Sequence, residues 1–106
     1  MKKTFLLLIT LVLLLSACSE PELSPIEKAQ QKAVSIGEQF LNYEITEDEA
    51  VEQLHSIKVP ETEGNGQLYL QTDIDYLAFL ILQENSTYEK IKEKVESIRS
   101  RDYTDE

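Results

Sequence analysis

The sequence predicts a small all-α bundle of about four short helices, arranged as two helical hairpins. Three capping signals that open apolar stretches with helical spacing, and the short loops between those stretches, favour this fold class. Residues 24–106 are expected to form one small domain with a modest core, because a chain of this length can bury only part of its surface.

The first two helices are expected on either side of a short loop at residues 43–45. Residues 24–27 (SPIE) combine a serine cap, a proline at the first helical position and a glutamate that completes a capping box, and the apolar spacing continues to about Asn42. Residues 46–49 (TEDE) repeat the capping box, and the second helix is expected to end near Lys58. Because the loop is so short, the two helices fold back as a hairpin.

Two more helices are expected after the turn-rich segment 60–66. Residues 72–75 (TDID) have the composition of a third helix start and lead into the apolar stretch 76–82, which we expect to be the central element of the core. Residues 86–89 (STYE) begin a fourth helix with one apolar and one charged face. The acidic tail from about residue 101 lacks periodicity and is expected to fray.

Residues 57–71 could form a short β-hairpin instead of a loop or part of a helix. Asn65 and Gly66 form a hairpin turn signal, and the residues on either side, from Ile57 and from Leu68, alternate between apolar and polar as strands do. The segment is therefore loop, hairpin or helix.

The first 17 residues have the features of a signal peptide. Lys2 and Lys3 form a cationic start, and an apolar run of eleven residues follows at 5–15. A membrane-spanning helix needs about 20 apolar residues, and small residues follow this shorter run at once. We therefore expect export and cleavage rather than a retained membrane helix.

The leader ends in an aliphatic residue and two small residues, Leu15, Ser16 and Ala17, and a cysteine, Cys18, follows directly. This motif resembles the lipobox of bacterial lipoproteins. The resemblance implies that Cys18 receives a diacylglycerol thioether with acyl chains such as palmitate, that a peptidase cuts after Ala17, and that Cys18 becomes the mature N-terminus. Because two or more acyl chains hold a protein stably at a bilayer, lipid replaces a transmembrane helix.

The location that this resemblance implies is the extracytoplasmic face of the cell membrane. Ser19 after the cysteine and the acid-rich body favour a Gram-positive surface, and the outer membrane of a two-membrane cell is the alternative. Residues 18–23 form the lipidated cysteine and a tether that spans at most about 17 Å. The membrane, through the anchor at Cys18, is therefore an expected partner.

The cysteine count and the charge balance of the chain exclude several kinds of site and partner. Cys18 is the only cysteine, so an intrachain disulfide, a cysteine-based zinc site or a thiol redox pair cannot form. After cleavage, eight basic residues remain against twenty acidic ones. Such a surface repels nucleic acid, whose binding depends on lysine and arginine. We expect no nucleic acid, and a protein partner at the cell surface.

The candidate catalytic residues are His55 and a pair of aspartates. Glu52 could orient the ring of His55, yet no nucleophile or second histidine accompanies it. Asp73-Ile74-Asp75 resembles the D-x-D motif of some metal-dependent glycosyltransferases, but residues two apart on a helix point in different directions. We interpret His55 as a surface histidine and the two aspartates as helix-capping residues favoured by the dipole.

Three further motifs also have structural explanations. The acidic cluster at 44–49 lacks the spaced ligand loop of a calcium site. Residues 85–87 match a glycosylation sequon that a helix cap explains better, and residues 64–66 are too short for a phosphate loop. We expect no catalytic residue, no metal site and no cofactor.

The apolar residues of the third helix provide the remaining functional signal. Tyr69, Tyr76, Phe79 and Leu80 cannot all face one interior from a single helix, so some are expected to be exposed and to bind a partner helix or a lipid-like ligand. Core packing or self-association is the other interpretation. The sequence therefore predicts a small, non-enzymatic lipoprotein that acts as an interaction or accessory module. The alternative is a binding protein for a small apolar or cationic ligand.

Overall fold

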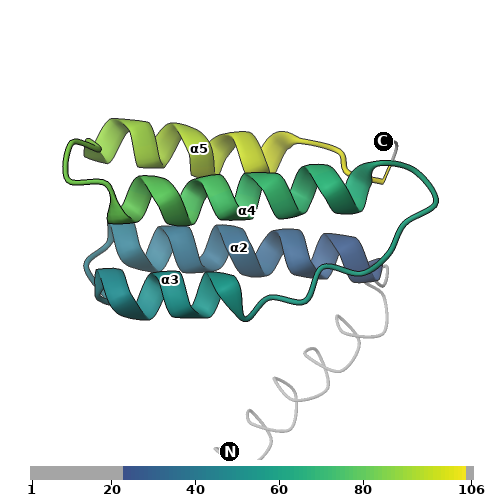
Figure 1. Ribbon diagram of the computed structural model, residues 1–106, viewed down its shortest axis with the longest axis horizontal. Coiled ribbons are helices and arrows are strands. Elements are labelled where there is room, and N and C mark those ends of the chain that lie inside the picture. The colour runs from purple at the N-terminus through teal and green to yellow at the C-terminus, as the bar shows by residue number, and fades with distance from the viewer. Residues whose placement is uncertain (1–22, 105–106) are drawn as a thin grey trace, which may run out of the picture.

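The structure is a computed structural model and describes residues 23–104. These residues form four helices, joined by loops, and no strand (Figure 1). The helices are α2 (Pro25–Leu41), α3 (Glu47–His55), α4 (Gly66–Leu82) and α5 (Tyr88–Ser100). The predicted all-α bundle is therefore confirmed. The predicted signal peptide and its junction at Ala17 and Cys18 lie outside the described residues.

The helices pack as two antiparallel hairpins, as predicted. The hairpin of α2 and α3 lies against the hairpin of α4 and α5, with α5 packed along α2 and α3 packed along α4 (Figure 1). The two short interhelix loops share one end of the bundle, and the long connection from α3 to α4 crosses the other end. Within the described segment, no helix combines the length and apolar character needed to cross a membrane.

The capping boxes predicted at residues 24–27 and 46–49 are both present. In each, the cap hydroxyl accepts from the backbone N–H three residues on, and the glutamate accepts from the N–H of the cap, at 3.2 or 3.3 Å. These local hydrogen bonds determine where α2 and α3 begin. α2 ends at Leu41, one residue earlier than predicted, and α3 ends at His55 rather than near Lys58.

The third helix begins earlier than predicted. α4 starts at Gly66 rather than at residues 72–75, and Thr72 lies inside the helix, where its hydroxyl donates to the carbonyl of Leu68 at 2.8 Å. The buried Leu70 continues the inner face of α4 by one turn toward the N-terminus, so tertiary packing overrides the local capping signal. The alternative β-hairpin at 57–71 is wrong because residues 66–71 belong to this helix.

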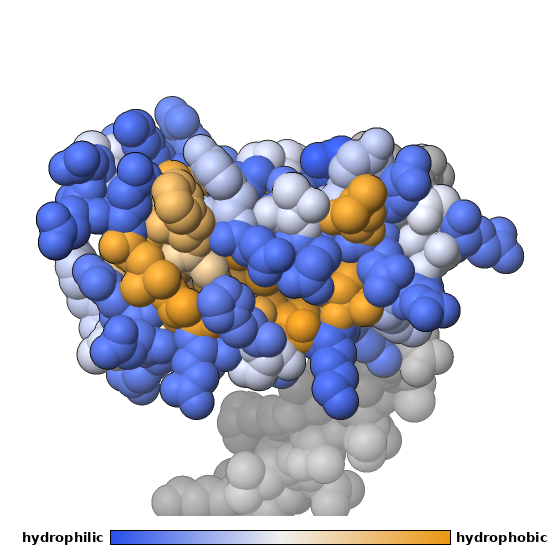
Figure 2. Space-filling model, in the orientation of Figure 1, coloured by the Kyte–Doolittle hydropathy of each residue, from blue (hydrophilic) through white to orange (hydrophobic). Residues whose placement is uncertain are grey.

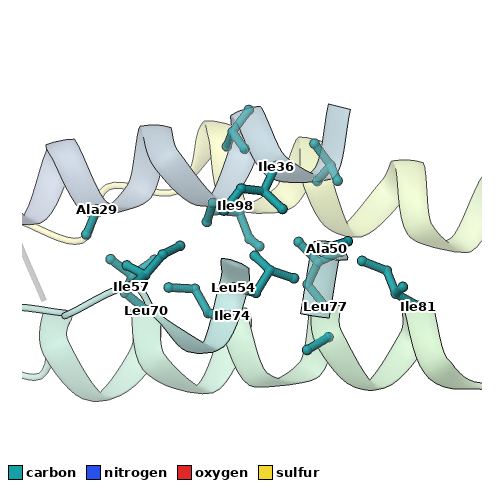
Figure 3. Close-up of a cluster of buried hydrophobic side chains, with 14 of the residues drawn as sticks. Ala29, Ile36, Ala50, Leu54, Ile57, Leu70, Ile74, Leu77, Ile81 and Ile98 are labelled. Atoms are coloured by element: carbon teal, nitrogen blue, oxygen red, sulfur yellow. The ribbon is translucent and has the colours of Figure 1, made fainter. Parts of the chain in front are cut away.

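The core lies between the two hairpins, and all four helices contribute to it. Leu70, Ile74 and Leu77 of α4 have no exposed surface, nor has Leu54 of α3. Figure 3 shows labelled core side chains converging from all four helices and from the connection after α3: Ala29, Ile36, Ala50, Leu54, Ile57, Leu70, Ile74, Leu77, Ile81 and Ile98. The apolar third helix contributes to the core as predicted, but the stretch 76–82 is not buried throughout, because Tyr76, Phe79 and Leu82 are about half exposed.

The C-terminal segment packs onto the bundle, so the prediction that it frays from residue 101 is wrong for residues 101–104. Tyr103 is only 1% exposed. Its backbone carbonyl lies against the first turn of α4, where a Cβ added to Gly66 would be 2.0 Å from the Tyr103 oxygen. The segment can therefore cross the start of α4 only because residue 66 has no side chain.

Small residues on α2 allow α5 to approach closely. Ala29, Ala33 and Gly37 recur every four residues on the buried side of α2. A Cβ added to Gly37 would lie 2.5 Å from Cγ2 of Val95, which is 1% exposed. The two helices can therefore lie this close together only because residue 37 has no side chain.

We expect Gly37→Ala to destabilise the domain although alanine is the better helix former. The gain in helix propensity is about 1 kcal/mol, whereas forcing an extra methyl group into a packed core costs typically about 1–3 kcal/mol. Urea unfolding should show a net loss of about 1 kcal/mol. The same change in a Val95→Ala background should be less damaging, and an equal loss in both backgrounds would contradict this explanation.

Candidate functional site

Asp73 is the one charged residue that is buried among the described residues, at 6% exposure. One carboxylate oxygen, Oδ1, lies 2.8 Å from Nζ of Lys94 on α5. The other, Oδ2, accepts a 2.6 Å hydrogen bond from the hydroxyl of Tyr103 and lies 3.4 Å from Nη1 of Arg101. Both oxygens of this buried carboxylate therefore have partners, as a charge in a core requires. We call these four residues the Asp73 cluster.

Aromatic rings cover the two cations of the Asp73 cluster. The guanidinium carbon of Arg101 lies 4.5 Å from the centre of the Tyr69 ring and 5.5 Å from that of Tyr103. Nζ of Lys94 lies 5.1 Å from the centre of the Tyr76 ring. Each contact falls within the distance at which a cation is attracted to a ring face, about 6 Å. The rings therefore stabilise the same charges that pair with the carboxylate.

The interpretation of Asp73 and Asp75 as helix-capping residues is wrong. Both lie inside α4, well after its start at Gly66. They point in different directions, as helical geometry requires: Asp73 is buried, whereas Asp75 is exposed and accepts a 3.1 Å hydrogen bond from the side chain of Gln71. The two carboxylates therefore do not form a joint site.

The other predicted site residues lie on the surface. His55 is exposed in the last turn of α3, so its interpretation as a surface histidine is confirmed. Residues 47–49 of the acidic cluster form the exposed first turn of the same helix. Thr87 of the sequon caps α5, accepting from the N–H of Lys90 at 3.2 Å, as predicted. Across residues 23–104, no group of three histidine, cysteine or acidic residues is placed to hold a metal ion.

The outer face of α4 exposes apolar side chains to solvent. Leu68, Tyr76, Phe79 and Leu82 are 63%, 49%, 56% and 52% exposed. Their spacing places them on one side of the helix, opposite the buried Leu70, Ile74 and Leu77. We call these four exposed residues the α4 stripe. Figure 2 shows hydrophobic surface over α4 and along its border with α3.

The sequence does not determine which of the apolar residues Tyr69, Tyr76, Phe79 and Leu80 face the solvent. Of the four residues in question, Leu80 is buried at 5%, whereas Tyr69, Tyr76 and Phe79 are at least 36% exposed. The prediction that some of them face outward is confirmed. A helix that is apolar on both faces is normally covered on both, and α4 has an uncovered one.

A groove of about 540 Å³ runs along the outer side of α2 toward Arg99. Gln30 and the charged residue Arg99 in its lining already have partners in the fold. Nε2 of Gln30 donates to the carbonyls of Ile98 and Arg101 at 2.7 and 2.8 Å and so caps the end of α5. Arg99 pairs with Glu38 and Glu96. These contacts give the groove a structural role.

We expect Asp73→Asn to lower the free energy of unfolding by about 3 kcal/mol, because removing one member of a buried ion pair leaves the remaining charges without their counterion. Lys94 and Arg101 keep some access to water, which places the loss at the lower end of the usual range. Asp75→Asn, the matched control on the exposed side of α4, should change stability by less than about 0.5 kcal/mol. Urea unfolding measures both, and equal effects would contradict a central role for Asp73.

No protein-family model, curated protein or solved structure matches this chain. Its function is therefore inferred from its own residues and their arrangement.

Proposed function

We propose that this protein is a small lipid-anchored bacterial surface lipoprotein whose helical domain is a non-enzymatic interaction module. The α4 stripe is the observation that carries this proposal, because an uncovered apolar helix face is the feature that protein partners bind. The lipobox-like motif ending at Cys18 supports the anchor. The isolated, exposed His55 and the full pairing of the buried Asp73 carboxylate favour binding over catalysis.

The proposed anchor brings the domain close to the extracytoplasmic membrane face. Six residues separate Cys18 from the first residue of α2, Pro25. A segment of this length spans about 20 Å when fully extended. Twenty acidic residues against eight basic ones in the processed chain repel anionic headgroups, so the body is directed outward. A Gram-positive cell surface fits the proposal best, and an outer membrane is the alternative.

The proposed occupant of the α4 stripe is a second protein with an apolar contact surface flanked by basic side chains. A further copy of the same chain is disfavoured, since two bodies with this excess of acidic residues repel each other. The polar neighbours of the stripe on α4, Gln71, Thr72 and Asp75, include an acid and no base. Lys94, whose ammonium lies over the Tyr76 ring, is already paired with Asp73. Apolar contact would supply affinity, and charge would select the partner.

The anchor is tested by replacing its attachment residue. In the native host, wild-type protein should sediment with membranes, and its N-terminal peptide should have the mass of an acylated cysteine. Cys18→Ser removes the sulfur that carries the lipid, so this variant should not be acylated and should be lost from the membrane fraction. Ser19→Ala is the matched control and should remain bound. An unacylated wild-type terminus, or equal membrane binding of Cys18→Ser, would refute the proposal.

The stripe is tested by placing a photo-crosslinking amino acid at position 79 in intact cells, with position 92 on the exposed side of α5 as control. We expect a discrete hetero-adduct from position 79 only. Leu82→Glu, which puts a charge into the stripe, should remove the adduct, and Lys92→Glu should leave it unchanged. A homodimer adduct, an adduct that survives Leu82→Glu, or no adduct at position 79 would contradict the proposed partner.

A further inference from the structure

A pocket of about 220 Å³ lies at the end of the bundle where the α2–α3 and α4–α5 loops meet. This is the end opposite to the start of α2, where the chain leaves the proposed tether (Figure 1). Leu41, Ile81 and Ile91, each at most 9% exposed, contribute the buried apolar part of its lining. A concave site with an apolar floor and a few polar groups is the usual form of a small-molecule site.

Aromatic and acidic side chains make up much of the remaining lining. Phe40, Tyr43 and Tyr88 contribute rings, and Glu47 and Glu84 contribute carboxylates. Tyr43 is 89% and Tyr88 is 48% exposed, so these rings stand at the open side of the pocket. No lysine, arginine or histidine lines the pocket. Ring faces and carboxylates both attract positive charge.

The two loops at this end of the bundle are acidic. Neither α2 nor α4 has a basic residue in its last turn, so the negative ends of their dipoles are not offset there. At the same place, acidic first-turn residues offset the positive end of α3, and the first turn of α5 has Glu89 next to Lys90. Residues 42–49 and 83–89 contain six acidic residues and no basic one: Glu44, Glu47, Asp48, Glu49, Glu84 and Glu89.

Tyr43 occupies a position where folding favours glycine. Its φ is 60°, and it is the only non-glycine residue with positive φ in the described part of the chain. The N–H of Tyr43 donates to the carbonyl of Phe40 at 3.1 Å, and that of Glu44 donates to the carbonyl of Gln39 at 2.9 Å. This hydrogen-bond pattern is a Schellman motif, whose left-handed residue is usually glycine. Neither backbone energy nor burial explains an exposed tyrosine here.

We infer that this pocket binds a small organic cation with a quaternary ammonium group. The rings of Tyr43 and Tyr88 would contact the ammonium methyl groups, Glu47 and Glu84 would balance the charge, and the apolar floor would accept the remaining carbon atoms. A free solute is the expected source. A lipid headgroup carries a phosphate that the acidic rim repels, and the start of α2, which follows the proposed tether in the sequence, lies at the other end of the bundle.

The binding test uses the acylated mature chain in maltoside micelles, titrated with choline chloride and followed by ¹H–¹⁵N NMR. We expect saturable shifts confined to residues 40–47 and 81–91. The uncharged isostere 3,3-dimethylbutan-1-ol should cause none, because it lacks the positive charge. Glycerophosphocholine, the soluble headgroup, should bind more weakly than choline. Equal binding of the uncharged isostere, tighter binding of glycerophosphocholine, or no saturable shift would overturn the inference.

The variants separate recognition from folding. Tyr43→Gly should weaken choline binding roughly five- to tenfold and, because it relieves the left-handed backbone, should also raise the melting temperature. Glu84→Gln should weaken binding, whereas Glu89→Gln, the same charge change outside the pocket, should not. Unchanged affinity in Tyr43→Gly, or equal effects of the two glutamate changes, would overturn the assignment. The α4 stripe is untouched in all three variants, so these results are independent of the partner proposal.

Discussion

The buried carboxylate of Asp73 determines how the second half of the chain is arranged. Its partners Lys94, Arg101 and Tyr103 lie 21, 28 and 30 residues further along, so one side chain joins α4, α5 and the C-terminal segment. Replacing such a pair by apolar residues can be neutral for stability, whereas breaking it is costly, so its main effect is on specificity of packing. Both oxygens are satisfied only when α5 and the segment after it lie where they do.

This constraint gives the two ends of the bundle different roles. At one end, Tyr103 is held by Asp73 and its carbonyl packs against Gly66, so the C-terminal segment closes that end. At the other end, short loops connect the helices, and the pocket beside Tyr43 and Tyr88 remains open. The half-exposed Tyr69 and Tyr76 cover the paired cations and are therefore partly structural, whereas Phe79 and Leu82 have no such role within the described residues. Together with Leu68, which is 63% exposed, these two residues are the part of α4 most available to a partner.

The sequence predicts what short-range interactions determine. The caps of α2, α3 and α5 depend on residues at most three positions apart. Those of α2 and α3 are where the pattern predicts them, and that of α5 is Thr87, one residue after the start of the predicted segment 86–89. The residues next to Asp73 resemble a helix start and therefore predict a cap, whereas its ion pairs and its hydrogen bond with the buried Tyr103 depend on residues far along the chain. The pocket was missed for the same reason, since its lining comes from both loops. One signal was present: a tyrosine at the end of the first helix, where glycine is expected.

Charge and apolar surface contribute differently to recognition by this domain. The field of the excess acidic residues acts over the whole surface and decays within about 8 Å at physiological salt, so it attracts cationic groups without distinguishing one from another. Discrimination needs contacts that depend on shape, and these are concentrated on the outer face of α4 and around the loop-end pocket. Both places combine aromatic rings with nearby carboxylates and lack an unpaired buried polar side chain among the described residues. Their selectivity would therefore come from the fit of apolar groups against rings, with the acidic field determining only the sign of the charge that approaches.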